Sequence, residues 1–191
     1  MKRDVLASLS DEKLVVYVRE KDKEAYSEVV RRYGDKLWRY VQYMIRDGDL
    51  AAEIVQRAMV KGYENLNSFD VSRKFSSWIY RIAHNETISE MRGRKKILYW
   101  PLDADLWGVF ESREQSPEDK LDDKLMKEWL DSCMAELSEK YRAVLVLYYL
   151  EDKSYEEISE ILRISMGTVG TRLSRGKALV KKLCNRNNGK K

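Results

Sequence analysis

Residues 154–183 read SYEEISEILRISMGTVGTRLSRGKALVKKL, which is the pattern of two short helices separated by a tight turn. Ser154 and Glu157 have the spacing of a capping box, in which the hydroxyl accepts from a free amide and the glutamate reaches back to the cap amide. Isoleucines and a leucine at helical spacing follow, residues 163–164 form the turn, and Ser165 is suited to cap a second helix. The stretch predicts a helix-turn-helix.

The second helix and the residues after it are strongly cationic. From Arg163 to the end the chain has nine lysines and arginines and no acidic residue. Phosphate is the natural partner of such a surface, and in DNA-binding proteins the second helix of this motif enters the major groove. A solvated basic helix on an unrelated domain is the alternative. Two capped helices with apolar residues at packing positions are more specific than charge alone, so DNA binding is favoured.

One face of the second helix is expected to read bases. If Val169 and Leu173 are buried, the opposite face points into the major groove. That face carries Thr168, Thr171, Arg172 and Arg175.

Composition predicts an all-α protein. The 191 residues include only two prolines and nine glycines, and 43% are hydrophobic, enough to pack one domain or two small ones. Apolar residues recur at helical spacing over residues 14–18, 26–45, 51–66 and 75–91. We expect a four-helix domain over residues 1–96, an acidic and aromatic linker over 97–115, and a second helical domain over 116–191. Residues 143–150 are an apolar run that periodicity alone does not separate from a strand, and their context favours helix.

The net charge of +4 hides a strong segregation of charge. Residues 103–123 contain eight acids and two bases, whereas the basic residues gather toward the ends of the chain. A polyanion would therefore meet the ends and be repelled by the middle.

Nothing in the sequence predicts catalysis or a cofactor. Cys133 and Cys184 match no metal or redox spacing, and the single histidine, His84, has no triad or metal motif around it. The longest apolar run is too short to span a bilayer, and no signal sequence is evident, so we expect a cytoplasmic protein without direct membrane insertion.

A polar stripe lies on the helix predicted over residues 75–91. Residues of this stripe recur at intervals of three and four, which suits a separated nucleic-acid strand because Asn can bond a base edge and Arg can bond phosphate. The stripe consists of Arg81, Asn85, Ser89 and Arg92. The apolar residues of the same helix are expected to be core: Phe75, Trp78, Ile79, Ile82 and Ala83.

Three segments resemble bacterial RNA polymerase sigma factors of the extracytoplasmic-function (ECF) group of the sigma-70 family. Residues 51–59, AAEIVQRAM, resemble the core-binding helix of region 2.2. Residues 68–85, SFDVSRKFSSWIYRIAHN, resemble regions 2.3 and 2.4, and residues 154–183 resemble region 4.2. The resemblance implies a protein that binds core RNA polymerase at the β′ clamp and β flap and directs it to promoters. It also implies control by an anti-sigma factor.

The resemblance assigns further residues to each surface. Core polymerase binding falls on Glu53, Ile54, Gln56, Arg57 and Val60, with Ile54 open to the alternative of a core position. Contacts with the melted −10 strand fall on the loop residues Asn67, Ser68, Phe69, Asp70, Arg73 and Lys74, for which a plain solvated loop is the competing interpretation. The −35 surface adds Ser154, Tyr155, Ser174 and Lys177 to the reading face of the second helix.

The sequence departs from the family pattern at four positions. Arg57 replaces a usual acid, Glu86 a usual apolar residue, Arg163 a usual turn glycine, and Gly170 a common polar reader. The competing functions are a stand-alone helix-turn-helix regulator and an enzyme acting on nucleic acid. The regulator usually needs a dimer seam, which the sequence lacks, and the enzyme has only the basic surface in its favour.

Overall fold

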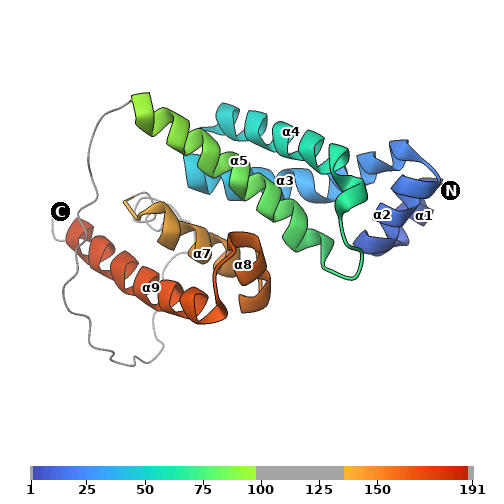
Figure 1. The fold of residues 1–191 in the computed structure, drawn as a ribbon. Helices are drawn as coiled ribbons and strands as arrows, with labels where there is room; N and C mark the ends of the chain where they lie inside the picture. Colours follow the sequence, from blue (N-terminus) through green and yellow to red (C-terminus); the bar gives the residue numbers. More distant parts are fainter. Residues whose placement is uncertain (1, 98–135, 189–191) are drawn as a thin grey trace.

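The computed structural model describes residues 2–97 and 136–188, and within them the only regular structure is helical (Figure 1). The longer helices are α3 (Tyr26–Ile45), α4 (Gly48–Glu64), α5 (Phe75–Ile97) and α9 (Met166–Asn188). The shorter ones are α1 (Lys2–Ser8), α2 (Asp11–Glu20), α7 (Glu139–Tyr149) and α8 (Tyr155–Leu162), with single 3-10 turns η1 (Lys23–Ala25) and η2 (Leu66–Ser68). The prediction of an all-α fold is confirmed. The expected linker, except for Ile97 at the end of α5, and residues 116–135 lie outside the described residues.

Side-chain caps mark the starts of two helices in the N-terminal unit, α2 and α4. The Ser10 hydroxyl accepts from the amide of Lys13 at the start of α2, and the Asp47 carboxylate accepts from the amide of Leu50 at the start of α4. Between α3 and α4 the chain turns through Arg46, whose φ of 64° is left-handed. These caps satisfy amides that a helix leaves unpaired in its first turn.

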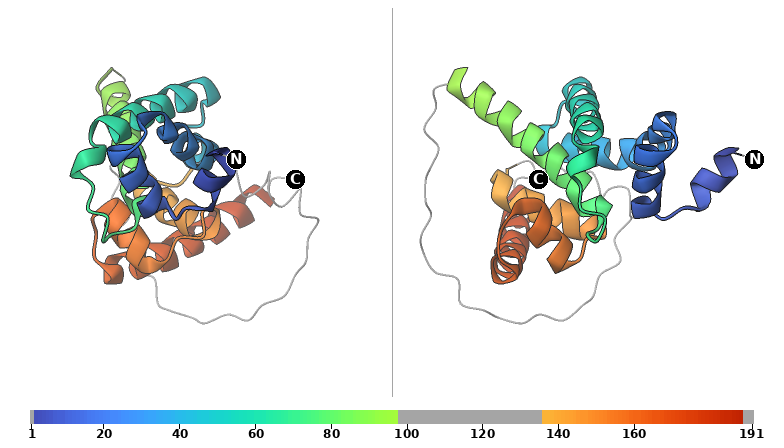
Figure 2. Two further views of the ribbon diagram at one scale, coloured as in Figure 1. Left: turned by 90° about the vertical axis from the view of Figure 1, so that its right-hand side faces the viewer. Right: turned by 45° about the vertical axis from the view of Figure 1, so that its right-hand side comes forward.

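The N-terminal unit is built around α3, against which α4 and α5 pack (Figures 1 and 2). Its centre contains Leu37, Tyr40, Ile54, Phe75 and Ile79, all without solvent exposure. The four predicted helices are present, whereas α1 was not predicted because its seven residues are too few to show a periodic pattern. Of the five core residues predicted on α5, Trp78 and Ile82 are half-buried at the edge of the core, and the other three are fully buried.

The C-terminal unit is the predicted helix-turn-helix, α8 and α9, packed against α7. The capping box is present, with the Ser154 hydroxyl accepting from the amide of Glu157 and the Glu157 side chain accepting from the amide of Ser154. The turn passes through Arg163 in the left-handed region, at φ 54° and ψ 48°. Residues 143–149 are helical, as expected from their context.

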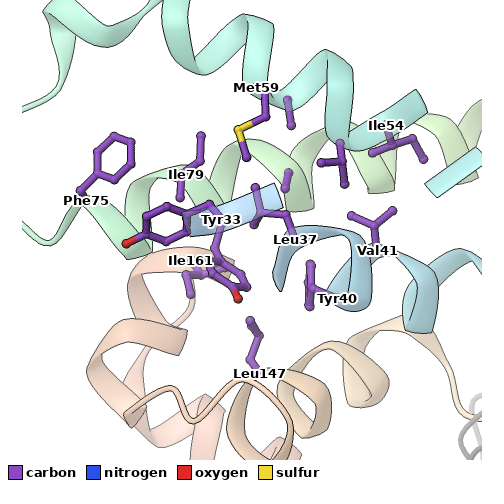
Figure 3. Packing of buried hydrophobic residues seen from close by; sticks show 14 of the residues in the cluster. Tyr33, Leu37, Tyr40, Val41, Ile54, Met59, Phe75, Ile79, Leu147 and Ile161 are labelled. Atoms are coloured by element: carbon purple, nitrogen blue, oxygen red, sulfur yellow. The ribbon is translucent and has the colours of Figure 1, made fainter. Parts of the chain in front are cut away.

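The two units share one continuous hydrophobic core. Leu147 of α7 and Ile161 of α8 point toward Tyr33 and Tyr40 of α3 (Figure 3). Helix α8 also packs along α5, so the helix-turn-helix lies against the N-terminal unit (Figure 1). The sequence predicted two domains and did not predict this contact.

Candidate nucleic-acid interface

The loop between α4 and α5, residues 67–74, is anchored by hydrogen bonds from α2 and by hydrogen bonds of its own. The Arg19 guanidinium of α2 donates to the carbonyl oxygens of Leu66 and Phe69. Within the loop, the Asp70 carboxylate accepts from the amide of Ser72 at 3.0 Å and from its hydroxyl at 2.7 Å. These bonds lower the pKa of Asp70. The loop is therefore anchored before any ligand binds.

The loop separates its polar side chains from its aromatic one. Phe69 is buried, and its ring lies 5.4 Å from that of Phe75 and 5.3 Å from that of Trp78. The other predicted loop residues are exposed: Asn67, Ser68, Asp70, Arg73 and Lys74. Phe69 thus positions the loop from inside, and the exposed residues are available to a ligand.

The predicted stripe on α5 faces outward along most of its length. Asn85, Ser89 and Arg92 are exposed, and Arg81 is half-buried. Burial, and the charge of Arg163 nearby, lower the pKa of Arg81. Of the two arginines on the stripe, Arg81 is therefore more buried than Arg92.

A pocket of about 240 Å³ connects the loop with α5 and α8. Ser77 lines it and is 2% exposed, and its hydroxyl has no hydrogen-bond partner among the described residues. Such a group favours a polar ligand, because a buried hydroxyl without a partner is costly. The lining residues are Ser68, Phe69, Asp70, Arg73, Lys74, Ser77, Trp78, Arg81, Glu160 and Arg163. Ser77 and Glu160 were not predicted as site residues, since neither lies in the loop at residues 67–74, on the polar stripe of α5 or on the reading face of α9.

The second surface is the outer face of α9. Val169 and Leu173 are buried, as predicted, and Thr171, Ser174, Arg175 and Lys177 are exposed. Thr168 and Arg172 are half-buried. The face is thus open mainly at its C-terminal part.

The start of α9 is fixed by a local cap. The Ser165 hydroxyl accepts from the amide of Thr168 at 3.2 Å.

Tyr155 is 42% exposed, and a Cβ built on Gly170 would lie 3.6 Å from its ring. A phenol ring therefore stands beside position 170, where a polar reader is common in the family.

Four of the five residues assigned to polymerase binding lie on the exposed side of α4. They are Glu53, Gln56, Arg57 and Val60. Ile54 is fully buried, which favours the alternative of a core position for this residue. Arg57 forms ion pairs with α5, where its guanidinium lies 2.8 Å from the carboxylate of Glu90 and 3.9 Å from that of Glu86.

The described residues contain no group of three or more His, Cys, Asp or Glu side chains that could hold a metal. Within the same ranges, no helix is both long and apolar enough to cross a membrane.

Comparison with known proteins accounts for both units. Residues 29–97 match the family Sigma-70 region 2, and residues 127–180 match Sigma-70, region 4. The ECF RNA polymerase sigma factor SigW of Bacillus subtilis is 36% identical over 89% of this chain and 94% of its own length. The ECF RNA polymerase sigma-E factor of Escherichia coli (strain K12) is 30% identical over 90% of this chain and 93% of its own length.

Solved structures agree on the fold. CnrH, in its complex with the cytosolic domain of CnrY, matches with a TM-score of 0.70 at 21% identity, over 92% of this chain and 97% of CnrH. The sigma factor RpoE of Bartonella quintana, in complex with the anti-sigma factor NepR, matches with a TM-score of 0.65 at 21% identity, over 84% of this chain and 96% of RpoE.

A two-part helical protein with a helix-turn-helix and matches to regions 2 and 4 is a transcription initiation factor of the sigma-70 class. The chain belongs to the ECF RNA polymerase sigma factors, which direct promoter-specific transcription. The alternative of a stand-alone helix-turn-helix regulator is not favoured.

Proposed function

We propose that the chain binds core RNA polymerase through the exposed side of α4 and reads a promoter through two separate surfaces. The loop at residues 67–74 and the stripe on α5 bind the melted −10 strand, and the outer face of α9 reads the −35 duplex. The observation that carries this proposal is that the exposed side chains of Asn85, Ser89 and Arg92 follow one another along α5 next to an anchored, exposed polar loop. A polar and cationic stripe of this kind suits an unpaired strand.

Each part of the chain has its own role in this proposal. Residues 1–96 act in polymerase binding and −10 recognition, residues 97–115 link the two parts, and residues 116–191 act in −35 recognition. The protein has no enzymatic step of its own, needs no cofactor, and acts in the cytoplasm beside the polymerase.

A partner that restrains the factor is the second part of the proposal. The solved complex of RpoE contains the anti-sigma factor NepR, and the likeness of this chain to RpoE in fold supports an anti-sigma factor for this chain too. Purification of the tagged chain from unstressed cells should recover a small inhibitor. Repeated recovery of only free or polymerase-bound chain would contradict this part.

Reconstituted transcription tests the main proposal. The full chain with core polymerase should start transcription on promoters of its own organism, whereas the chain alone should bind the same DNA weakly. Asn85→Ala should reduce open-complex formation without reducing binding to core polymerase. Ser8→Ala, on the distant helix α1, is the control. Failure of the wild-type chain to associate with core polymerase at micromolar concentration would refute the proposal.

A further inference from the structure

The pocket between the loop, α5 and α8 is lined by an excess of positive charge. Its lining includes four cations and two carboxylates. The cations are Arg73, Lys74, Arg81 and Arg163, and the carboxylates are Asp70 and Glu160. Asp70 accepts hydrogen bonds from the amide and the hydroxyl of Ser72, so its carboxylate is already satisfied within the loop. The pocket therefore attracts an anion.

Two groups in the pocket would gain from a negatively charged ligand. The Ser77 hydroxyl is buried and has no hydrogen-bond partner among the described residues. The Arg81 guanidinium is half-buried, and burial and the charges of Arg163 and Arg73 lower its pKa, against the opposing charge of Glu160. A ligand with negatively charged oxygens would accept a hydrogen bond from the serine and stabilise the charged form of the arginine.

Arg163 contributes its cation from an unusual backbone position. It follows α8 in the left-handed region, at φ 54° and ψ 48°, where a residue with a Cβ is strained and glycine is not. The turn that carries it is fixed, because the Ser159 hydroxyl donates to the carbonyl oxygen of Ile164 at 2.6 Å. The pocket thus gains a guanidinium at a position where the backbone alone favours glycine.

Helix α8 is held beside α5 by the packing around a buried carboxylate. The Glu151 side chain, 2% exposed, accepts from Arg39 of α3 at 2.7 Å and from the Tyr80 hydroxyl of α5 at 2.5 Å. Glu160 and Arg163, which belong to α8 and the turn after it, therefore face the pocket together with residues of α5 (Figure 1). The pocket is complete only with α8 in this position.

The size and the walls of the pocket limit the ligand. Its volume of about 240 Å³ is smaller than the roughly 300–1,000 Å³ of pockets that take drug-sized ligands. The half-buried Trp78 adds an apolar wall, and the centre of its ring lies 5.3 Å from that of the Phe69 ring. Phosphate suits the cations, because a guanidinium can bind two phosphate oxygens through parallel N–H groups.

We propose that this pocket is a binding site for a small phosphorylated molecule, of the size of a nucleoside monophosphate or smaller, held by Arg81, Arg163 and the Ser77 hydroxyl. Its phosphate also lies beside Arg73 and Lys74, which are expected to meet the phosphates of the −10 strand. Ligand and strand therefore compete, and promoter opening responds to the concentration of the ligand. The competition rests on the proposed −10 assignment, whereas binding of the ligand does not.

Arg163→Gly is the main test, and the chain offers a closely matched control. Glycine suits the left-handed backbone, so the variant should fold and lose only the guanidinium. Arg46→Gly makes the same replacement at an exposed arginine with a similar backbone, φ 64° and ψ 29°, at the end of α3 and outside the pocket lining. Both variants lose one positive charge, so a difference between them reports on the pocket.

Isothermal titration calorimetry of the full chain with adenosine monophosphate measures the binding. Wild type and Arg46→Gly should bind with similar affinity, and Arg163→Gly should bind roughly tenfold more weakly, as for loss of one hydrogen bond between charged groups. Binding of inorganic phosphate should depend on the same arginine, and adenosine, which lacks the phosphate, should bind much more weakly than its monophosphate.

Three results would overturn the proposal. The first is equal affinity of Arg163→Gly and Arg46→Gly for both phosphate compounds. The second is equal affinity of wild type for adenosine and adenosine monophosphate. The third is that wild type binds neither adenosine monophosphate nor inorganic phosphate at millimolar concentration.

Ser77→Ala separates ligand binding from stability. Without ligand, loss of a buried hydroxyl that has no partner should leave the free energy of unfolding unchanged or raise it. Binding of adenosine monophosphate should nevertheless weaken several-fold, because the phosphate loses a hydrogen-bond donor. Wild-type affinity in this variant would overturn the role of Ser77.

Competition with DNA tests the consequence for the −10 surface. Adenosine monophosphate should displace a short, fluorescein-labelled single-stranded DNA of mixed sequence from the wild-type chain, and displacement from Arg163→Gly should need a higher concentration. If the −10 assignment is wrong, the nucleotide still binds in a manner that depends on Arg163 but does not displace the DNA. Failure of the −10 assignment and failure of the ligand site are thus distinguishable.

Discussion

The Nδ1 atom of His84 lies 2.7 Å from the hydroxyl oxygen of Tyr40, so the imidazole of α5 is hydrogen-bonded to a fully buried phenol of α3. Burial lowers the pKa of His84 to about 4, and the charge of Arg172 acts in the same direction against the opposing charge of Glu139. The ring is therefore neutral in the folded protein at neutral pH.

The first prediction concerns the pH dependence of stability. The unfolded chain protonates His84 near pH 6.5, whereas the folded chain does so only near pH 4. The unfolded state therefore binds more protons between these values, and the free energy of unfolding falls as the pH falls through this range. The loss amounts to roughly 3 kcal/mol at most, at about 1.4 kcal/mol for each pH unit.

Urea unfolding at neutral pH and near pH 4.5 measures this loss. His84→Gln keeps a polar group near Tyr40 but cannot titrate, so its stability should fall less over the same interval. An equal fall in wild type and variant would show that other groups cause the acid sensitivity.

Two helical glycines are predicted to respond oppositely to alanine. A Cβ on Gly62 would lie 2.8 Å from both the Ile79 side chain and the Tyr26 hydroxyl, whereas a Cβ on Gly34 would meet nothing within 4 Å. Gly34→Ala should therefore raise the free energy of unfolding by up to about 1 kcal/mol through helix propensity. Gly62→Ala should lower it by roughly 1–3 kcal/mol through overpacking. Chemical denaturation measures both, and stabilisation by Gly62→Ala would contradict the close packing of Ile79 and Tyr26 around Gly62.

The α4 surface can be separated from the core beneath it. Val60 is 51% exposed, so Val60→Ala should weaken binding to core polymerase while changing the free energy of unfolding by less than about 0.5 kcal/mol. Ile54→Ala should instead cost about 2–5 kcal/mol of stability, because that side chain is fully buried. Glu53→Lys should weaken polymerase binding with helicity unchanged. Unchanged polymerase affinity in both the Val60 and the Glu53 variants would remove α4 from the binding surface.

The outer face of α9 should separate specificity from affinity. Arg175→Ala should relax base preference at one −35 position, since a bidentate arginine contributes roughly 1–3 kcal/mol of discrimination. Lys182→Ala should lower binding to all sequences and reduce the salt dependence by about one unit of slope. Selection from a randomised −35 library distinguishes them. Identical preferences for wild type and Arg175→Ala would mean that another face of α9 reads the bases.

The parts of the fold that depend on local sequence could be predicted. The Ser154 capping box, the turn at Arg163 and the burial of Val169 all follow from residues a few positions apart, and the structure has each of them. The resemblance also predicted the class of protein, because its three segments carry family-specific motifs.

Features that depend on tertiary packing could not be predicted in this way. Arg39 and Glu151 are 112 residues apart, and neither position differs in pattern from an ordinary solvated charge. The resemblance places Ile54 in the polymerase-binding segment and leaves a core position open, and only the packing of α4 on the core shows that the side chain faces inward. Likewise, only the packing of α5 against its neighbours shows that the buried Ser77 lines the pocket.

The ion pairs between Arg57 and α5 limit which residues position 57 can carry. Arg57 and Glu86 both depart from the family pattern, and the structure places them in one ion-pair network with Lys61, whose ammonium lies 2.6 Å from Glu86, and with Glu90. A glutamate at position 57 would put a third carboxylate beside two others and would destabilise the α4–α5 contact. Arg57 therefore suits a helix pair that already carries Glu86 and Glu90, and we expect an acidic residue at position 57 to be accompanied by loss of a carboxylate at position 86 or 90.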